Sequence, residues 1–472
     1  MEKSIKRILV VFHNSTPDEK TRITILQHLQ VFEYSEFKHH LVYYNTYEAT
    51  PRGVIDTAHV SIPSNLKNMV FDAIILHYTF LNQCTLGFSF YKWRRKFDWI
   101  RELNCLKIAM PQDEGDFIEL LDEWLFDLGV SVIFSIHYRK GGPLYPIMSE
   151  HSSIYPCLPG YIDDKTANRL KRTLLPICER QKDIVYRARQ LPYRFGKAGR
   201  MKYMVADMVA PRAISRGFNV DISTRYEDAI YGDTWFDFLS SAKAVIGTPG
   251  GWSAIDWRGE LRANTNRMLR KNPSLRFEEF NKQMSKGWDD YQFFTVTPRH
   301  FEAVITKTCQ VLVEGDYKGI LEADRHYLPI KQDFSNLDDV LEKLQDVNYL
   351  QELADRAYKD IFLTGQYSYR SFAKKIDIIL NKHLNSEKEV GVSMTDSKSA
   401  NKAIAALERQ LIAERHQNAL IHASIPDLAD QMTEKIVSAL AKRVKAQIKR
   451  LLPVLGGFAL AVAIGLVLVF TR

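Results

Sequence analysis

Short apolar runs alternate with amphipathic stretches along the first part of the chain. Residues 6–13 (KRILVVFH) have the pattern of a buried strand, and a polar segment and a helical stretch through Phe32 follow them. Four more runs of strand length come next, at 40–44, 71–78, 106–110 and 130–137, with helical stretches at 91–103 and 116–128 between them. Apolar runs of this length that alternate with helices predict a parallel sheet covered on both faces.

The alternation restarts after a segment rich in Pro, Tyr and Gly (140–159) and a helical connector (164–180). Strand-like runs at 183–189, 218–222, 244–247 and 309–313 alternate with helical stretches near 197–215, 235–242 and 301–307, and three more helical stretches lie between 336 and 384. The pattern predicts an α/β protein with two Rossmann-like lobes, 1–160 and 161–385, and a cleft between them. Ligands of such sheets bind beyond the C-terminal ends of the strands, which points to 13–16, 77–79, 111–114 and His137.

The C-terminal part has a different pattern. A polar linker is expected at 386–400, followed by a helical stalk at 401–450, either a coiled-coil or membrane-surface stalk or a solvated spacer. Residues 451–470 contain no charged or amide side chain, and at about 1.5 Å per residue they span about one bilayer core. Six basic residues precede this segment within sixteen positions, so we expect a single-pass, tail-anchored membrane protein with its N-terminal bulk in the cytoplasm. The alternative is a buried C-terminal helix.

Composition and charge fit this organisation. The chain of 472 residues is 46% hydrophobic and 25% charged, which excludes a disordered or collagen-like protein. Of the net charge of +8, seven positive charges lie between Lys435 and Arg472, so the rest is nearly neutral and no nucleic-acid partner is expected. The five cysteines are scattered without a Cys-x-x-Cys pair, which argues against a disulfide framework or a zinc site.

Two segments carry candidate chemistry in the second half. After the strand-like run at 244–247, Gly250 and Gly251 would let backbone amides approach a phosphate, and a helix starting near Ser253 would aim its positive end at the same place. The alternative is a purely structural Gly-Gly turn. Arg299 and Glu302 stand at an expected helix start after Pro298, where the guanidinium could face phosphate oxygens and the carboxylate could accept bonds from ribose hydroxyls. The alternative is an ordinary first-turn carboxylate with a surface arginine.

The run from Arg299 to Ala303 (RHFEA), followed by a strand and a glycine, resembles the R-x-x-E-A element in the C-terminal lobe of GT-B-fold glycosyltransferases, related to transferases with a Glu-x7-Glu motif. The resemblance covers roughly 183–384 and implies that Glu302 binds the ribose of a nucleotide sugar. Phe294 stands where the first motif glutamate is expected, and 257–296 looks like an insertion. The resemblance also implies that basic residues neutralise the donor diphosphate without a metal or other cofactor. The candidates are Arg187, Arg189 and Lys202.

An inverting transfer also needs a base for the acceptor hydroxyl. His13, at the end of the first strand, stands where some inverting relatives have their base, and Asp113 is the second candidate. The resulting hypothesis is a glycosyltransferase that acts at the cytoplasmic membrane face on a glycan or lipid-linked acceptor, as in polysaccharide biosynthesis, with a possible homo-oligomer through the stalk. Two other functions stay open: a catalytically silent scaffold of a polysaccharide-assembly complex, and a sugar-nucleotide epimerase.

Overall fold

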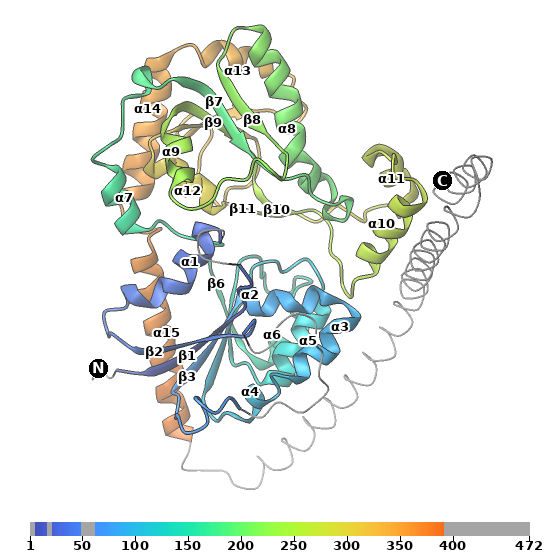
Figure 1. Ribbon diagram of the computed structural model, residues 1–472, viewed down its shortest axis with the longest axis vertical. Coiled ribbons are helices and arrows are strands. Elements are labelled where there is room, and N and C mark those ends of the chain that lie inside the picture. Colours follow the sequence, from blue (N-terminus) through green and yellow to red (C-terminus); the bar gives the residue numbers. More distant parts are fainter. Residues whose placement is uncertain (1–4, 17–20, 49–61, 391–472) are drawn as a thin grey trace, which may run out of the picture. The chain divides into compact units, whose positions relative to one another are not determined.

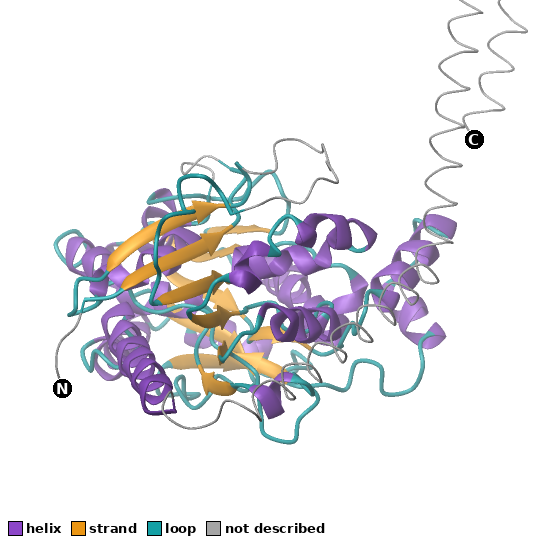
Figure 2. Ribbon diagram, turned by 90° about the horizontal axis from the view of Figure 1, so that it is seen from below, coloured by secondary structure: helices purple, strands orange, loops and turns teal. Residues whose placement is uncertain are grey.

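The computed structural model describes residues 5–16, 21–48 and 62–390 (Figure 1). The predicted stalk and the predicted membrane-spanning segment lie outside these residues, as does most of the predicted linker. Within the described part, no helix is long and apolar enough to cross a membrane. The described residues form two α/β lobes, and helices flank the strands on both sides (Figure 2).

The first lobe contains a six-stranded, fully parallel sheet in the order β2-β1-β3-β4-β5-β6. Five of its strands confirm the runs expected from the sequence, while β6 lies in a segment for which no strand was predicted. The strands are β1 (Arg7–Phe12), β2 (His40–Asn45), β3 (Ala73–His77), β4 (Leu106–Met110), β5 (Val132–Ser135) and β6 (Ser153–Pro156). The helices are α1 (Ile23–Leu29), α2 (Tyr78–Leu81), α3 (Phe88–Arg95), α4 (Trp99–Glu102), α5 (Ile118–Leu128) and α6 (Met148–His151).

The second lobe contains a five-stranded parallel sheet in the order β13-β12-β9-β7-β8. Its strands are β7 (Lys182–Arg187), β8 (Val220–Ser223), β9 (Ala242–Gly247), β12 (Cys309–Val313) and β13 (Tyr327–Ile330). Its helices are α7 (Asp164–Leu170), α8 (Gly196–Ser215), α9 (Thr234–Ser240), α12 (Pro298–Ile305), α13 (Leu337–Lys343) and α14 (Val347–Ala357). The expected insertion forms α10 (Glu260–Lys271) and α11 (Phe277–Gln283), between the short antiparallel strands β10 (Gly250–Trp252) and β11 (Phe293–Thr295).

In both sheets, the order in which successive strands are added reverses after the second strand of the lobe. The first strand of each lobe lies between the second and the third strand of that lobe, so the chain switches sides at β1/β3 and at β7/β9. Open α/β sheets bind ligands beyond the C-terminal ends of the strands at such a switch point. In the second lobe this rule points to the segments that follow Arg187 and Gly247.

Burial on both faces explains the continuous apolar runs. In β7, Ile184 and Tyr186 pack into one core cluster while Val185 packs into the cluster on the opposite face. In β12, Val311 and Leu312 likewise pack into the core clusters on opposite faces of the sheet. When both faces of a strand are buried, its sequence does not alternate between apolar and polar residues.

The last described helix, α15 (Tyr369–Val390), packs on the first lobe although our boundary at residue 385 placed it in the second. Phe372 and Ile376 lie in the same core cluster as Ile8 of β1. Asp377 accepts hydrogen bonds from His39 Nε2 (3.0 Å) and Ser35 Oγ (2.8 Å). The helix also continues through 386–390, which we predicted as linker, because this stretch (SEKEV) contains good helix formers and no glycine or proline.

Candidate functional site in the cleft between the lobes

A cavity of about 400 Å³ lies between the two lobes, beyond the C-terminal ends of β7 and β9 and facing those of β4 and β5. Eight of the ten predicted site residues line it: Asp113, Arg187, Arg189, Lys202, Gly250, Gly251, Arg299 and Glu302. His13 and Ser253 are not among the lining residues. The structure therefore collects most of the sequence candidates around one crevice.

Four cationic side chains line this cavity without forming an ion pair in the described part of the chain: Arg22, Arg189, Lys202 and Arg299. Lys202 Nζ donates to the carbonyl oxygen of Gly251 at 2.9 Å. The Arg299 guanidinium donates to the carbonyl oxygen of Arg187 and lies 5.2 Å from the ring centroid of Trp235. No carboxylate pairs with any of the four at contact distance, although Asp113 attracts Arg22 and Lys202 from farther away. Such a group of cations is the electrostatic pattern of a site for a polyanion.

The four cations are close enough to influence one another. Desolvation and then the charges of Arg189 and Arg299 lower the pKa of Arg22. Desolvation also lowers the pKa of Lys202 to about 8, with the Asp113 carboxylate opposing and Arg299 adding to the shift. Arg22 comes from the first lobe and the other three come from the second, so the positive region is built by both lobes.

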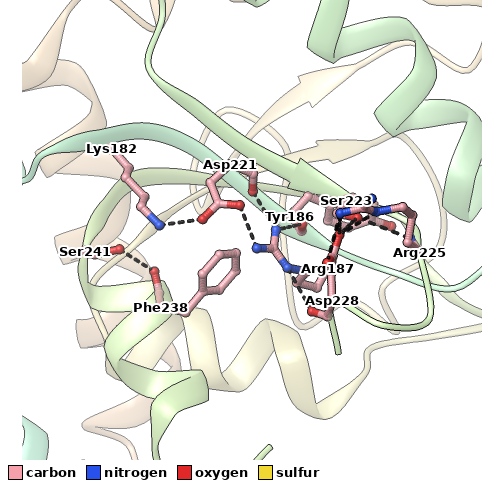
Figure 3. Close-up of polar contacts among 9 residues, drawn as sticks. All are labelled: Lys182, Tyr186, Arg187, Asp221, Ser223, Arg225, Asp228, Phe238 and Ser241. Carbon is pink, nitrogen blue, oxygen red and sulfur yellow. Dashed lines mark hydrogen bonds and ion pairs between the residues drawn. The ribbon is translucent and has the colours of Figure 1, made fainter. Parts of the chain in front are cut away.

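Arg187 lines the cavity, but its guanidinium also bonds several groups of the second lobe (Figure 3), and its contact with phosphate stays a prediction. Its guanidinium donates to Asp221 Oδ1 at 2.6 Å and to the carbonyl oxygens of Asp221 (3.0 Å), Asp228 (3.1 Å) and Tyr186 (2.9 Å). It also lies 4.5 Å from the ring centroid of Phe238. These hydrogen bonds connect β7 to β8 and to the following loop. Most of the N–H donors of Arg187 therefore already have partners within the protein.

Gly250 and Gly251 line the cavity, but the pairing of β10 with β11 already explains why they are glycines. A Cβ atom on Gly251, whose φ is +96°, would lie 1.7 Å from the carbonyl oxygen of Phe293 in the partner strand. A Cβ on Gly250 would lie 2.4 Å from Thr297 Cγ2. Both close approaches are to other parts of the second lobe, β11 and the N-cap of α12, as in the structural alternative considered above.

The helix expected near Ser253 is wrong. The chain stays extended in β10, and the next helix, α10, begins at Glu260. Ser253 Oγ instead accepts a hydrogen bond from the backbone N–H of Ala198 (3.1 Å) in the first turn of α8. Asp289 accepts from the neighbouring N–H of Lys197 (3.1 Å). Both residues satisfy the free amides of α8, so this helix start is occupied by the protein's own side chains.

Glu302 is held at the wall of the cavity by the start of α12. Thr297 and Pro298 begin the helix, a combination that favours a helix N-terminus. The Glu302 side chain, in a residue only 6% exposed, accepts a hydrogen bond from Trp235 Nε1 through Oε2 at 2.6 Å. Burial raises its pKa to about 7, against the effects of this bond and of Arg299. No hydrogen bond to Oε1 exists within the described residues, which leaves one carboxylate oxygen for a ligand.

The two candidate bases lie in different surroundings. His13 Nδ1 bonds Thr46 Oγ1 at 2.9 Å, and its ring packs against Trp93 at a centroid distance of 6.2 Å, away from the cavity. Asp113 lines the cavity and accepts from Asn82 Nδ2 at 2.7 Å. Desolvation raises the pKa of Asp113, so its carboxylate binds a proton more readily than an ordinary aspartate. Of the two candidates, Asp113 is the one that faces the cleft.

Three further lining residues lacked a sequence signal for this site: Arg22, Trp235 and Gln310. His137, which the strand-end rule did single out, also lines the cavity, and burial lowers its pKa to about 3, so its ring is neutral at ordinary pH. The buried carboxylate of Glu114 accepts from the backbone N–H of Ile136 (2.9 Å) and His137 (3.2 Å), and this fixes the loop that carries the ring.

No protein-family model matches the chain, and no curated protein matches it in sequence. Among solved structures, it is similar to an α-glucosyltransferase in complex with UDP-glucose and DNA containing an abasic site (10% identity, 80% of this chain, 100% of that chain, TM-score 0.46). It is also similar to sucrose-phosphate synthase from Thermosynechococcus elongatus (9% identity, 81% and 100%, TM-score 0.41) and to an α1,3-fucosyltransferase with GDP (9% identity, 81% and 92%, TM-score 0.38). At these scores the likeness says nothing of this chain's substrates, and the R-x-x-E-A assignment stays a prediction.

Proposed function

We propose that the protein is a glycosyltransferase that moves a sugar from a nucleotide-sugar donor to a glycan or lipid-linked acceptor. The observation that carries this proposal is the convergence of Arg22, Arg189, Lys202 and Arg299 on one cavity beside the Glu302 carboxylate. A nucleoside diphosphate sugar offers a diphosphate to the cations and two ribose hydroxyls to the carboxylate. The topological switch point β7/β9 puts these groups where such sheets bind ligands.

The cavity residues suit the charge changes of glycosyl transfer. An acceptor hydroxyl oxygen forms a bond to the anomeric carbon while the bond from that carbon to the diphosphate oxygen breaks, and the electron pair leaves with the nucleoside diphosphate. Negative charge grows on the departing phosphate, where fixed cations lower the barrier most effectively. In an inverting reaction Asp113 takes the proton of the acceptor hydroxyl. We propose that the four cations neutralise the diphosphate without a divalent metal.

The membrane attachment remains part of the proposal. Residues 451–470 would anchor the protein, and the basic residues before them would keep the catalytic lobes on the cytoplasmic side. Deletion of residues 451–472 should move the protein from the carbonate-resistant membrane fraction to the supernatant. An unchanged distribution after the deletion would argue against this anchor.

A panel of nucleotide sugars tests the enzyme assignment. We expect Arg299→Ala to weaken binding of the matching nucleoside diphosphate at least about tenfold, while Arg212→Ala, an exposed cation on α8, leaves it unchanged. Asp113→Asn should lower turnover about 10²–10⁴-fold without weakening nucleotide binding, because it removes the proton acceptor and, with it, a negative charge that acts on Lys202. A wild-type protein that binds no nucleotide sugar would refute the proposal. Binding without any transfer would favour the silent scaffold, and interconversion of free nucleotide sugars would favour an epimerase.

A further inference from the structure

A buried amide without partners lines the cavity. Gln310 belongs to β12, where its backbone pairs with Val245 of β9 and Tyr327 of β13. Its side chain lines the cavity, the residue is only 2% exposed, and neither Oε1 nor Nε2 has a hydrogen-bond partner. Among the described residues, no other amide side chain is buried with both polar atoms unpartnered.

Leaving this amide unpaired is costly for the fold. A buried polar atom without a partner costs about 1–3 kcal/mol, and native proteins contain few of them. Leu312, two positions further on the same face of β12, packs into the apolar core cluster of that face. An apolar residue at position 310 would avoid the cost, so the presence of glutamine needs a reason other than stability.

The surroundings of Gln310 indicate what it meets. Leu239 of α9, Val245 of β9 and Leu312 line the same cavity and give it apolar walls. Trp235 and Glu302, joined by their hydrogen bond, also line it. The cavity thus contains a carboxylate suited to a ribose, apolar side chains, and an amide with two donors and an acceptor.

We propose that Gln310 recognises the base of the nucleotide through its amide, an inference that rests on the proposed function. A nucleobase is flat and uncharged, so it fits apolar walls, and its edge presents a hydrogen-bond donor beside an acceptor. Glutamine can pair with such an edge through two hydrogen bonds at once, whereas a phosphate would require the cations found elsewhere in the cavity. Gln310 is then a specificity-determining residue of the donor site.

Calorimetric titration of the full-length protein with UDP, GDP, ADP and CDP, and with inorganic pyrophosphate, tests this role. For the best nucleotide we expect Gln310→Leu to weaken binding at least about tenfold, about 1.4 kcal/mol. Pyrophosphate affinity should stay the same, and thermal stability should be equal or higher because an unpaired amide is removed. Gln332→Leu, at an exposed position after β13, is the matched control and should change neither affinity.

The outcomes separate the two levels of the proposal. Unchanged nucleotide affinity in Gln310→Leu would overturn base recognition by Gln310 and leave the glycosyltransferase assignment intact. Base recognition by Gln310 would also be overturned if the wild-type protein bound nucleoside diphosphates no better than pyrophosphate. This second test does not depend on whether the variant folds. Absence of binding to every nucleotide would refute the proposed function itself, and with it this inference.

Discussion

Burial shifts the pKa values of two ionisable side chains of the cavity toward neutral pH, one upward and one downward. Burial raises the pKa of Glu302 to about 7 and lowers that of Lys202 to about 8. In both cases desolvation disfavours the charged form. Binding of a nucleotide needs both charged forms, the carboxylate to accept from ribose hydroxyls and the ammonium to face phosphate oxygens.

We therefore expect nucleoside diphosphate affinity to be highest between about pH 7 and 8. Below this window Glu302 takes up a proton and loses its acceptor strength, and above it Lys202 loses its charge. Titration calorimetry between about pH 5.5 and 9.5 measures the profile. Glu302→Gln should remove the fall on the acid side, and Lys202→Arg should remove the fall on the alkaline side because arginine stays charged. Identical profiles in the wild type and both variants would contradict these roles.

Two local signals located residues of the cavity. The strand-end rule gave Asp113, the expected helix start gave Arg299 and Glu302, and all three line the cavity. Arg187, which the resemblance suggested, forms an ion pair with Asp221 on the neighbouring strand. A pairing between strands that are distant in the sequence is not visible in a local pattern. Arg22 precedes a helix of the other lobe and had no local signal at all.

At the scale of elements, the start of α8 shows how the insertion and the residue after β10 support the second lobe. The first turn of this helix has no cap from its own neighbours, since Ser253 and Asp289 satisfy the amides of Ala198 and Lys197 from more than 50 residues away in the sequence. The sequence placed α8 correctly by its periodicity, but it could not show which distant side chains complete it. The same long-range pairing explains why we expected a helix near Ser253, where the structure has only a bend after β10.

Ser253→Ala should lower the free energy of unfolding by about 1 kcal/mol, because it leaves one N-terminal amide of α8 without its hydrogen bond. Chemical denaturation measures the change. Ser215→Ala, at the exposed C-terminal end of the same helix, is the control and should cost less than about 0.5 kcal/mol. Since Ser253 does not line the cavity, nucleotide affinity should change little. A loss of affinity far larger than the loss of stability would instead return Ser253 to the binding site.

At the scale of the whole described molecule, the segment between β10 and β11, which includes the insertion, ties the second lobe to the first. Asp256 pairs with Asp116 in a parallel bridge, and its carbonyl oxygen accepts from the N–H of Phe117 at 2.6 Å. Arg262 of α10 donates to Asp116 Oδ2 at 2.6 Å and to the carbonyl oxygen of Thr85 at 2.7 Å. We predicted the insertion from the sequence, but not its contact with Asp116, because Arg262 and Asp116 lie 146 residues apart and neither breaks its local pattern.

Arg262→Ala should therefore lower the free energy of unfolding by about 2 kcal/mol, since it leaves the largely buried Asp116 carboxylate with a longer contact to Arg194 (3.3 Å) as its remaining ion pair in the described part. Arg267→Ala removes an exposed arginine from the same helix and should cost less than about 0.5 kcal/mol. Denaturant titration of both variants gives the comparison. Nucleotide affinity should stay close to that of the wild type in each, because Arg262 does not line the cavity. Equal stability of the two variants would show that this ion pair does not hold the lobes together.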